Sequence, residues 1–167
     1  HYLHFDYRRT SGITYRILDN NYAYMRYPSF SYSIGEGNLD NVLATLALAD
    51  GLIIDVRDNG GGYLADMQEI LAPMIDTDLL IGYTRVKEGL GRLDYGPWVP
   101  CIVSPAENHR KVEAPIVVLA NLYSVSMSEM TCMAVSALPN GCVVGERTFG
   151  GTGPLYGDYK FAYSGAW

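Results

Sequence analysis

The chain has 167 residues, of which 49% are hydrophobic, so it is long enough for one folded domain with a substantial buried core. Its formal net charge of −6 and its lack of any lysine and arginine cluster argue against nucleic acid as a partner. No apolar run approaches the ~20 residues that a membrane-spanning helix needs. The three cysteines show no C-x-x-C spacing and are odd in number, which argues against a structural zinc site and a disulfide framework.

The first third of the chain predicts a β-hairpin followed by a helix. Residues 13–18 and 22–27 are β-prone runs of alternating character, and Asp19-Asn20-Asn21 between them is a turn signal. A helix then begins near Asn38, which can serve as its N-cap. The apolar side chains of this helix fall on one stripe: Leu39, Val42, Leu43, Leu46 and Ala47.

Residues 52–56 form a short apolar run after that helix, which is typical of a parallel strand buried on both faces. Asp55 ends the strand and Arg57 begins the next loop, so we expect them to anchor the turn as a buried pair. Three glycines follow, Gly60 to Gly62, and then a helix over about 64–74. Such a triplet forms either a flexible loop or a nest of N–H groups for an anion or oxyanion. It is not a phosphate loop, because no Gly-Lys-Ser/Thr follows.

The second half of the chain continues the alternation of strands and helices. Its pattern predicts strands at 79–86, 115–121 and 142–145 and a helix at 126–138. Residues 95–113 contain several prolines and predict an irregular or hairpin excursion. Helices between parallel strands indicate an α/β layered architecture.

Ser126 stands between the end of a buried strand and the start of a helix, where helix N–H groups and a partial positive charge are free. A serine at this place serves either as a nucleophile or only as an N-cap, which is the commoner role. Three loops, 57–62, 124–129 and 146–153, each follow a predicted strand. Because the carboxyl ends of such strands form one rim, we expect these loops to converge on one cleft.

Three ordered motifs resemble the S41 peptidase family, which includes the C-terminal processing proteases and tricorn protease. They are Leu-Ile-Ile-Asp-Val-Arg-Asp-Asn-Gly-Gly-Gly over 52–62, Ile-Val-Val-Leu-Ala-Asn through Ser-Val-Ser-Met-Ser-Glu over 116–129, and Val-Val-Gly-Glu-Arg-Thr-Phe-Gly-Gly over 143–151. The resemblance covers most of the chain from about residue 13 onward. It implies a ClpP/crotonase-like α/β core with mostly parallel buried strands and flanking helices.

The resemblance also implies roles for residues of these motifs. Ser126 would attack a peptide carbonyl and form an acyl-enzyme. The oxyanion donors would be the backbone N–H of Met127 and of the glycine turn, where Gly62 is the best match and Gly61 the next. Secondary site candidates are Glu129, Gly150 and Gly151. The resemblance implies no metal or other cofactor, and a peptide or unfolded protein as substrate.

This sequence departs from the family pattern in the residue that would act as the general base for the serine. Processing proteases use a lysine within Phe-Gly-Lys-Gly, but Gly151 occupies that position here and Leu155 replaces the glutamine that follows it. Lys160 is the nearest lysine and lies outside the motif, so a Ser–Lys dyad is excluded at this site. The tricorn-like branch instead takes an upstream histidine, usually within Asp-Gly-His, and a downstream glutamate. This chain has no Asp-Gly-His, and its three histidines do not match one: His1, His4 and His109.

We therefore interpret residues 1–167 as a single S41-like catalytic core of the tricorn-like branch, an excised or incomplete part of a longer protein. Its histidine base is expected from a segment outside this chain. The alternative is a non-catalytic relative that binds a peptide or another ligand in the same cleft, since a fold does not fix an activity. A crotonase-like acyl-CoA enzyme is disfavoured by the three ordered motifs. Family habit implies an extracytoplasmic location, as a periplasmic protein, lipoprotein or secreted protein.

Overall fold

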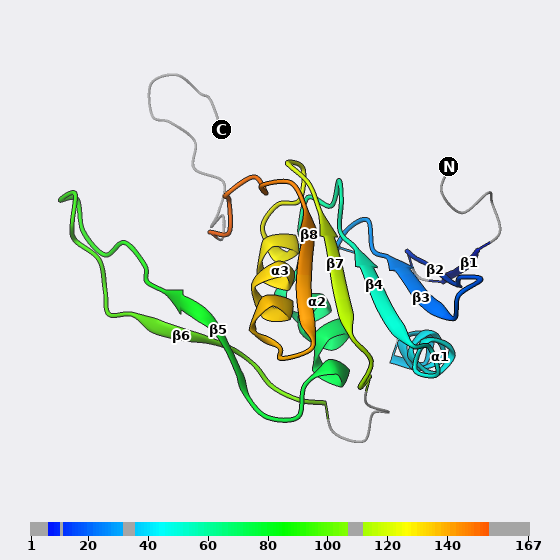
Figure 1. Cartoon of the computed structure of the whole chain (residues 1–167). Helices are drawn as coiled ribbons and strands as arrows, with labels where there is room; N and C mark the ends of the chain where they lie inside the picture. Colours follow the sequence, from blue (N-terminus) through cyan, green and yellow to red (C-terminus); the bar gives the residue numbers. More distant parts are fainter. Residues whose placement is uncertain (1–6, 11, 32–35, 107–111, 154–167) are drawn as a thin grey trace.

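The computed structural model describes residues 7–10, 12–31, 36–106 and 112–153. A six-stranded sheet forms the body of the molecule (Figure 1). Its strands, in spatial order, are β1 (Arg8–Thr10), β2 (Ile13–Ile17), β3 (Tyr22–Arg26), β4 (Gly51–Asp55), β7 (Ile116–Ala120) and β8 (Gly141–Gly145). A separate two-stranded ribbon consists of β5 (Leu79–Thr84) and β6 (Val99–Val103). The helices are α1 (Glu36–Leu46), α2 (Leu64–Leu71) and α3 (Met127–Ala137), with a 3-10 turn at Ala72–Met74.

The centre of the large sheet is parallel. Strands β3, β4, β7 and β8 pair in parallel, while β1 and β2 add an antiparallel edge beside β3. Helix α1 lies between β3 and β4 in the chain, and α3 lies between β7 and β8, as parallel crossovers require. The carboxyl ends of the four parallel strands therefore lie at one rim. The predicted α/β core with mostly parallel strands and flanking helices is confirmed.

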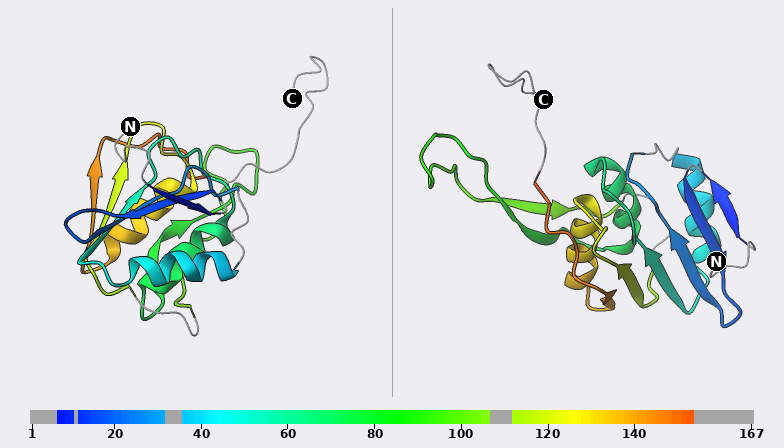
Figure 2. Two further views of the ribbon diagram at one scale, coloured as in Figure 1. Left: turned by 90° about the vertical axis from the view of Figure 1, so that its right-hand side faces the viewer. Right: turned by 90° about the horizontal axis from the view of Figure 1, so that it is seen from above.

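The hydrophobic core lies between the sheet and its helices (Figure 2). The predicted stripe on α1 is confirmed for Leu39, Val42, Leu43 and Leu46, which are each at most 3% exposed, whereas Ala47 lies just after the helix and is partly exposed. Burial of each of these four side chains contributes roughly 1.5–3 kcal/mol to holding α1 on the core. No helix in the described part of the chain is both long and apolar enough to cross a membrane.

Several element boundaries differ from the sequence prediction. Strand β1 was not predicted, and α1 begins two residues earlier than expected, so Asn38 lies inside the helix and not at its N-cap. The helix predicted over 64–74 is α-helical only to Leu71, since Pro73 has no N–H to continue the helical pattern. The excursion at 95–113 contains β6, which pairs antiparallel with β5, so the hairpin alternative is correct.

The β5–β6 ribbon extends away from the body of the molecule on the α3 side (Figures 1 and 2). Its base packs on the core through Ile81 and Val103, which are 8% and 1% exposed. Farther out, the Arg85 guanidinium lies 4.3 Å from the ring centroid of Tyr95 and 4.4 Å from that of Trp98. These cation–π contacts stabilise the exposed part of the ribbon.

Candidate active site

The loops after β4, β7 and β8 meet at the carboxyl rim of the sheet, as predicted from the sequence (Figure 1). The Val125 N–H donates to the Asn59 carbonyl at 2.9 Å, which joins the first loop to the second. The Phe149 N–H donates to the Ser124 carbonyl at 3.2 Å, which joins the second loop to the third. The three loops therefore build one site, although their positions in the chain are as much as 90 residues apart.

Ser126 has an unusual backbone conformation, with φ 58° and ψ −114°. An ordinary N-cap residue has β-region angles, so a capping role alone does not explain this geometry. Holding a non-glycine residue in such a sparsely populated region costs of order 1–3 kcal/mol, and such strain clusters at functional sites. The strained turn presents Ser126, which is partly exposed, at the N-terminus of α3.

The glycine turn after β4 packs directly against Ser126. A Cβ atom on Gly61 would lie 2.6 Å from the Ser126 Cβ and 2.9 Å from the Val125 carbonyl oxygen. A Cβ atom on Gly62 would lie 2.3 Å from the carbonyl carbon of Phe30. Both glycines also have positive φ, 92° and 144°. Only glycine allows this conformation together with so close an approach of backbone to backbone.

The N–H groups around Ser126 are of two kinds. The Gly61 N–H donates to the Asn59 Oδ1 at 2.8 Å and is therefore already occupied. The N–H groups of Met127 and Gly62 have no acceptor among the described residues. The Met127 nitrogen lies 3.2 Å from the position of a Cβ on Gly61, so the two turns adjoin. Of the two predicted glycine donors, Gly62 is therefore the one whose N–H is open among the described residues.

Glu129 connects the Ser126 turn with the second glycine loop. Its carboxylate is 5% exposed and accepts the N–H of Ser126 at 2.9 Å, of Gly151 at 2.8 Å and of Gly150 at 2.6 Å. Burial alone would raise the pKa of Glu129, but hydrogen bonds from Thr148 and from these three N–H groups hold its pKa below the ordinary range. The carboxylate therefore stays ionised and fixes both loops. The family resemblance indicated Glu129, Gly150 and Gly151 as secondary site candidates, but not that this carboxylate binds both glycine N–H groups.

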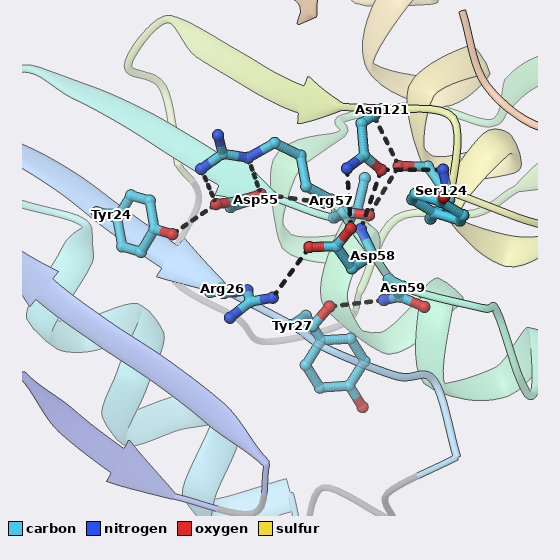
Figure 3. Close-up of polar contacts among 11 residues, drawn as sticks. Tyr24, Arg26, Tyr27, Asp55, Arg57, Asp58, Asn59, Asn121 and Ser124 are labelled. Carbon is cyan, nitrogen blue, oxygen red and sulfur yellow. Dashed lines mark hydrogen bonds and ion pairs between the residues drawn. The ribbon is translucent and has the colours of Figure 1, made fainter. Parts of the chain in front are cut away.

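A buried network supports the glycine turn from the side of the sheet (Figure 3). Asp55 is 1% exposed and accepts the Arg57 Nε at 2.9 Å, the Arg57 Nη2 at 2.6 Å and the Tyr24 hydroxyl at 2.6 Å. Burial alone would raise the pKa of Asp55, but hydrogen bonds from Arg57 and Tyr24 hold it below its usual value. Asp55 and Arg57 pair as expected from the sequence, within a network in which Asp55 is buried and Arg57 is partly exposed. Tyr24 is a third member of this network that the sequence did not indicate.

Two asparagines that the sequence analysis did not single out also organise this rim (Figure 3). The Asn121 side chain accepts the Asp58 N–H at 3.1 Å and donates to the Asp58 Oδ1 at 2.9 Å, which stabilises Asp58 at its positive φ of 61°. Arg26 forms an ion pair with Asp58 at 3.7 Å. Asn59 is fully buried beside the glycine turn. The sequence does contain a signal for each of them: Asn121 directly follows a buried strand, and Asn59 directly precedes the glycine triplet.

The described part of the chain contains no histidine, because His1, His4 and His109 all lie outside it, as do Leu155 and Lys160. Lys87, in the turn of the ribbon, is the lysine that falls within it. At the position of the family lysine, the Gly151 N–H is bound to Glu129. Within the same residues, no group of three His, Cys, Asp or Glu side chains could hold a metal ion.

The fold and the three loops are those of one peptidase family. A sequence model of peptidase family S41 matches residues 21–154, which is most of the chain. The chain belongs to this family. The carboxy-terminal processing protease CtpA of Bacillus subtilis is 31% identical over 134 residues, which cover 79% of this chain and 26% of that protein. Tricorn protease of Thermoplasma volcanium is 31% identical over 107 residues, which cover 64% of this chain and 9% of that protein.

Solved structures show the same fold. The crystal structure of a Parabacteroides merdae protein assigned as a peptidase superposes with a TM-score of 0.84 at 37% identity. The superposition covers 90% of this chain and 48% of that one. The chain thus spans about half of this structural relative, 26% of CtpA and 9% of tricorn protease.

Proposed function

We propose that this chain is the core of a serine peptidase that hydrolyses peptide bonds through an acyl-enzyme on Ser126. The observation that carries the proposal is the strained Ser126 turn, with φ 58° and ψ −114°, beside the open N–H groups of Met127 and Gly62. Membership of family S41 supports peptide hydrolysis as the reaction class. An ordinary N-cap serine needs neither the strain nor the adjoining glycine turn.

In the proposed reaction the general base takes the proton of the Ser126 hydroxyl as its oxygen attacks the carbonyl carbon of the scissile peptide bond, and it later gives this proton to the leaving amine. The carbonyl oxygen becomes an oxyanion and accepts hydrogen bonds from the Met127 and Gly62 N–H groups, while the N-terminus of α3 adds a favourable dipole. Collapse of the tetrahedral intermediate releases the amine half of the substrate and leaves an ester on Ser126. Water then attacks this ester and releases the acid half. In related chemistry, removal of one oxyanion donor costs about 10²–10³ in kcat.

We assign the general base to a histidine from a segment outside this chain, as in the tricorn-like branch. In this proposal the loop at 150–151 has a supporting role, because its N–H groups hold the Glu129 carboxylate that also binds the Ser126 N–H. The remaining parts of the proposal rest on family membership alone. They are a single catalytic core over residues 1–167, peptides or unfolded proteins as substrates, and an extracytoplasmic location.

The test is labelling of the full-length protein with a fluorophosphonate probe, read by intact mass. We expect the wild type to gain one label and Ser126→Ala to gain none. Ser136→Ala is the matched control, because Ser136 lies exposed on the same helix, α3, away from the rim. It should label like the wild type. A folded wild type that stays unlabelled would contradict the peptidase proposal and favour the alternative, a peptide-binding protein without catalysis.

A further inference from the structure

Both the nitrogen and the oxygen of the Asn59 side-chain amide form hydrogen bonds within the protein. It is 0% exposed. Its Nδ2 donates to the Tyr27 carbonyl at 2.6 Å (Figure 3), and its Oδ1 accepts the Gly61 N–H at 2.8 Å. One buried side chain thus connects the end of β3 with the glycine turn. A glycine pair with positive φ has wide conformational freedom of its own, so these bonds restrict it.

The backbone carbonyl of Asn59 also holds the nucleophile turn. It accepts the Val125 N–H at 2.9 Å and the Ser128 hydroxyl at 2.8 Å, and Ser128 is itself fully buried. These two donors stand on either side of Ser126 in the sequence. The same residue therefore touches both turns that carry the open N–H groups described above.

We propose that Asn59 is a positioning residue that sets the spacing between the Met127 and Gly62 N–H groups. This inference rests on the proposed peptidase function. An oxyanion is stabilised only when its donors lie about 2.7–3.1 Å from it, so the two turns must keep a fixed separation. Asn59 holds one turn through its side chain and the other through its carbonyl. Loss of the side chain frees the glycine turn from β3 and allows this separation to vary.

The first comparison is between Asn59→Ala and Asn140→Ala in the full-length protein. Asn140 is the matched control, because its Nδ2 also donates to a backbone carbonyl, that of Ala114 at 2.9 Å, but at the opposite end of the sheet. We expect Asn59→Ala to lower the fluorophosphonate labelling rate and kcat by about 100-fold, as for loss of one oxyanion donor, with KM little changed. Asn140→Ala should stay within about twofold of the wild type, as expected for a change far from the chemistry.

A second variant, Asn59→Asp, separates a positioning role from general destabilisation. The neutral carboxyl of this variant can replace both hydrogen bonds, because it accepts from the Gly61 N–H and donates to the Tyr27 carbonyl. The ionised carboxylate has no proton to donate and is repelled by the Tyr27 carbonyl oxygen. We therefore expect its labelling rate, divided by that of the wild type at the same pH, to rise as the pH falls. The ratio is compared over the pH range in which both proteins are fully folded, where a purely structural loss would leave it constant. If Asn59→Ala does not fold, this ratio decides the question.

The possible outcomes separate the two proposals. Normal labelling of a folded Asn59→Ala, or a constant ratio for Asn59→Asp, would overturn the positioning role and leave the peptidase function intact. A folded wild type without labelling would overturn the peptidase function and, with it, the catalytic meaning of Asn59. A selective loss in Asn59→Ala together with a rising ratio in Asn59→Asp would support the inference.

Discussion

Replacing Gly61 by alanine would place a methyl group against the nucleophile turn. The new Cβ would lie 2.6 Å from the Ser126 Cβ, 2.9 Å from the Val125 carbonyl oxygen and 3.2 Å from the Met127 nitrogen. Favourable contacts between such atoms lie near 3.5–4.0 Å, so the turns must separate by several tenths of an ångström or more. The neighbouring Gly60 is a matched control, because a Cβ there would have no atom within 4 Å.

The cost of Gly61→Ala has two parts. Alanine at the φ of 92° observed for Gly61 costs roughly 1–2 kcal/mol. Displacement of the packed Ser126 turn adds about 1–3 kcal/mol, as for other overpacked sites. The free energy of unfolding should therefore fall by about 2–5 kcal/mol. Gly60→Ala should change it by less than about 1 kcal/mol, toward greater stability, because alanine restricts the unfolded chain.

The assay is urea unfolding of both variants in the full-length protein, followed by the fluorophosphonate labelling rate under native conditions. Gly61→Ala should also label more slowly than Gly60→Ala, because the methyl group pushes on the two turns that hold the nucleophile and the oxyanion donors. Equal free energies of unfolding for the two variants would refute the packing argument. A destabilised Gly61→Ala with the wild-type labelling rate would refute the link between this turn and the nucleophile.

Three further predictions concern the buried carboxylates. Glu129→Gln should lower the free energy of unfolding by about 2–4 kcal/mol, because three N–H donors then face a neutral amide with one oxygen. The exposed Glu146→Gln should cost less than about 0.5 kcal/mol, and equal losses in urea unfolding would contradict this. Because the pKa values of Asp55 and Glu129 are lowered on folding, their stabilisation is complete above about pH 5 and is lost as the pH falls through the folded values. A urea unfolding midpoint that rises as the pH falls would contradict this predicted loss of stability. Tyr24→Phe removes a hydrogen bond that lowers the pKa of Asp55, so the folded pKa moves toward the unfolded value. Its acid-induced loss of stability should therefore be smaller, and end at a higher pH, than in the exposed control Tyr22→Phe, and coincident pH profiles would contradict the network.

Apart from β1 and β6, local sequence was sufficient to predict the order of the strands and helices and the positions of the three loops. The apolar runs at 52–56 and 115–121 need no distant information, because a strand buried on both faces is apolar along its whole length. The Gly60 to Gly62 triplet indicated an unusual backbone conformation. Parallel strands bring their carboxyl ends to one rim of the sheet, so the convergence of the loops was also predictable. The start of α1 was not, because helix ends depend on a few weak capping preferences.

Tertiary structure decided which groups around Ser126 are occupied and which are open. The bond from the Gly61 N–H to the Asn59 side chain spans only two residues and is of a local type that asparagine often forms, but the Met127 and Gly62 N–H groups are left open, within the described residues, by the way the loops pack. The Glu129 carboxylate binds N–H groups 21 and 22 residues further along the chain, and the Asn59 carbonyl binds the Ser128 hydroxyl 69 residues away. Such bonds depend on the separation of backbone segments that meet only when the sheet has formed. A sequence motif predicts the residue types present at the site. The packing of the three loops decides which polar groups of these loops remain free to bind a substrate.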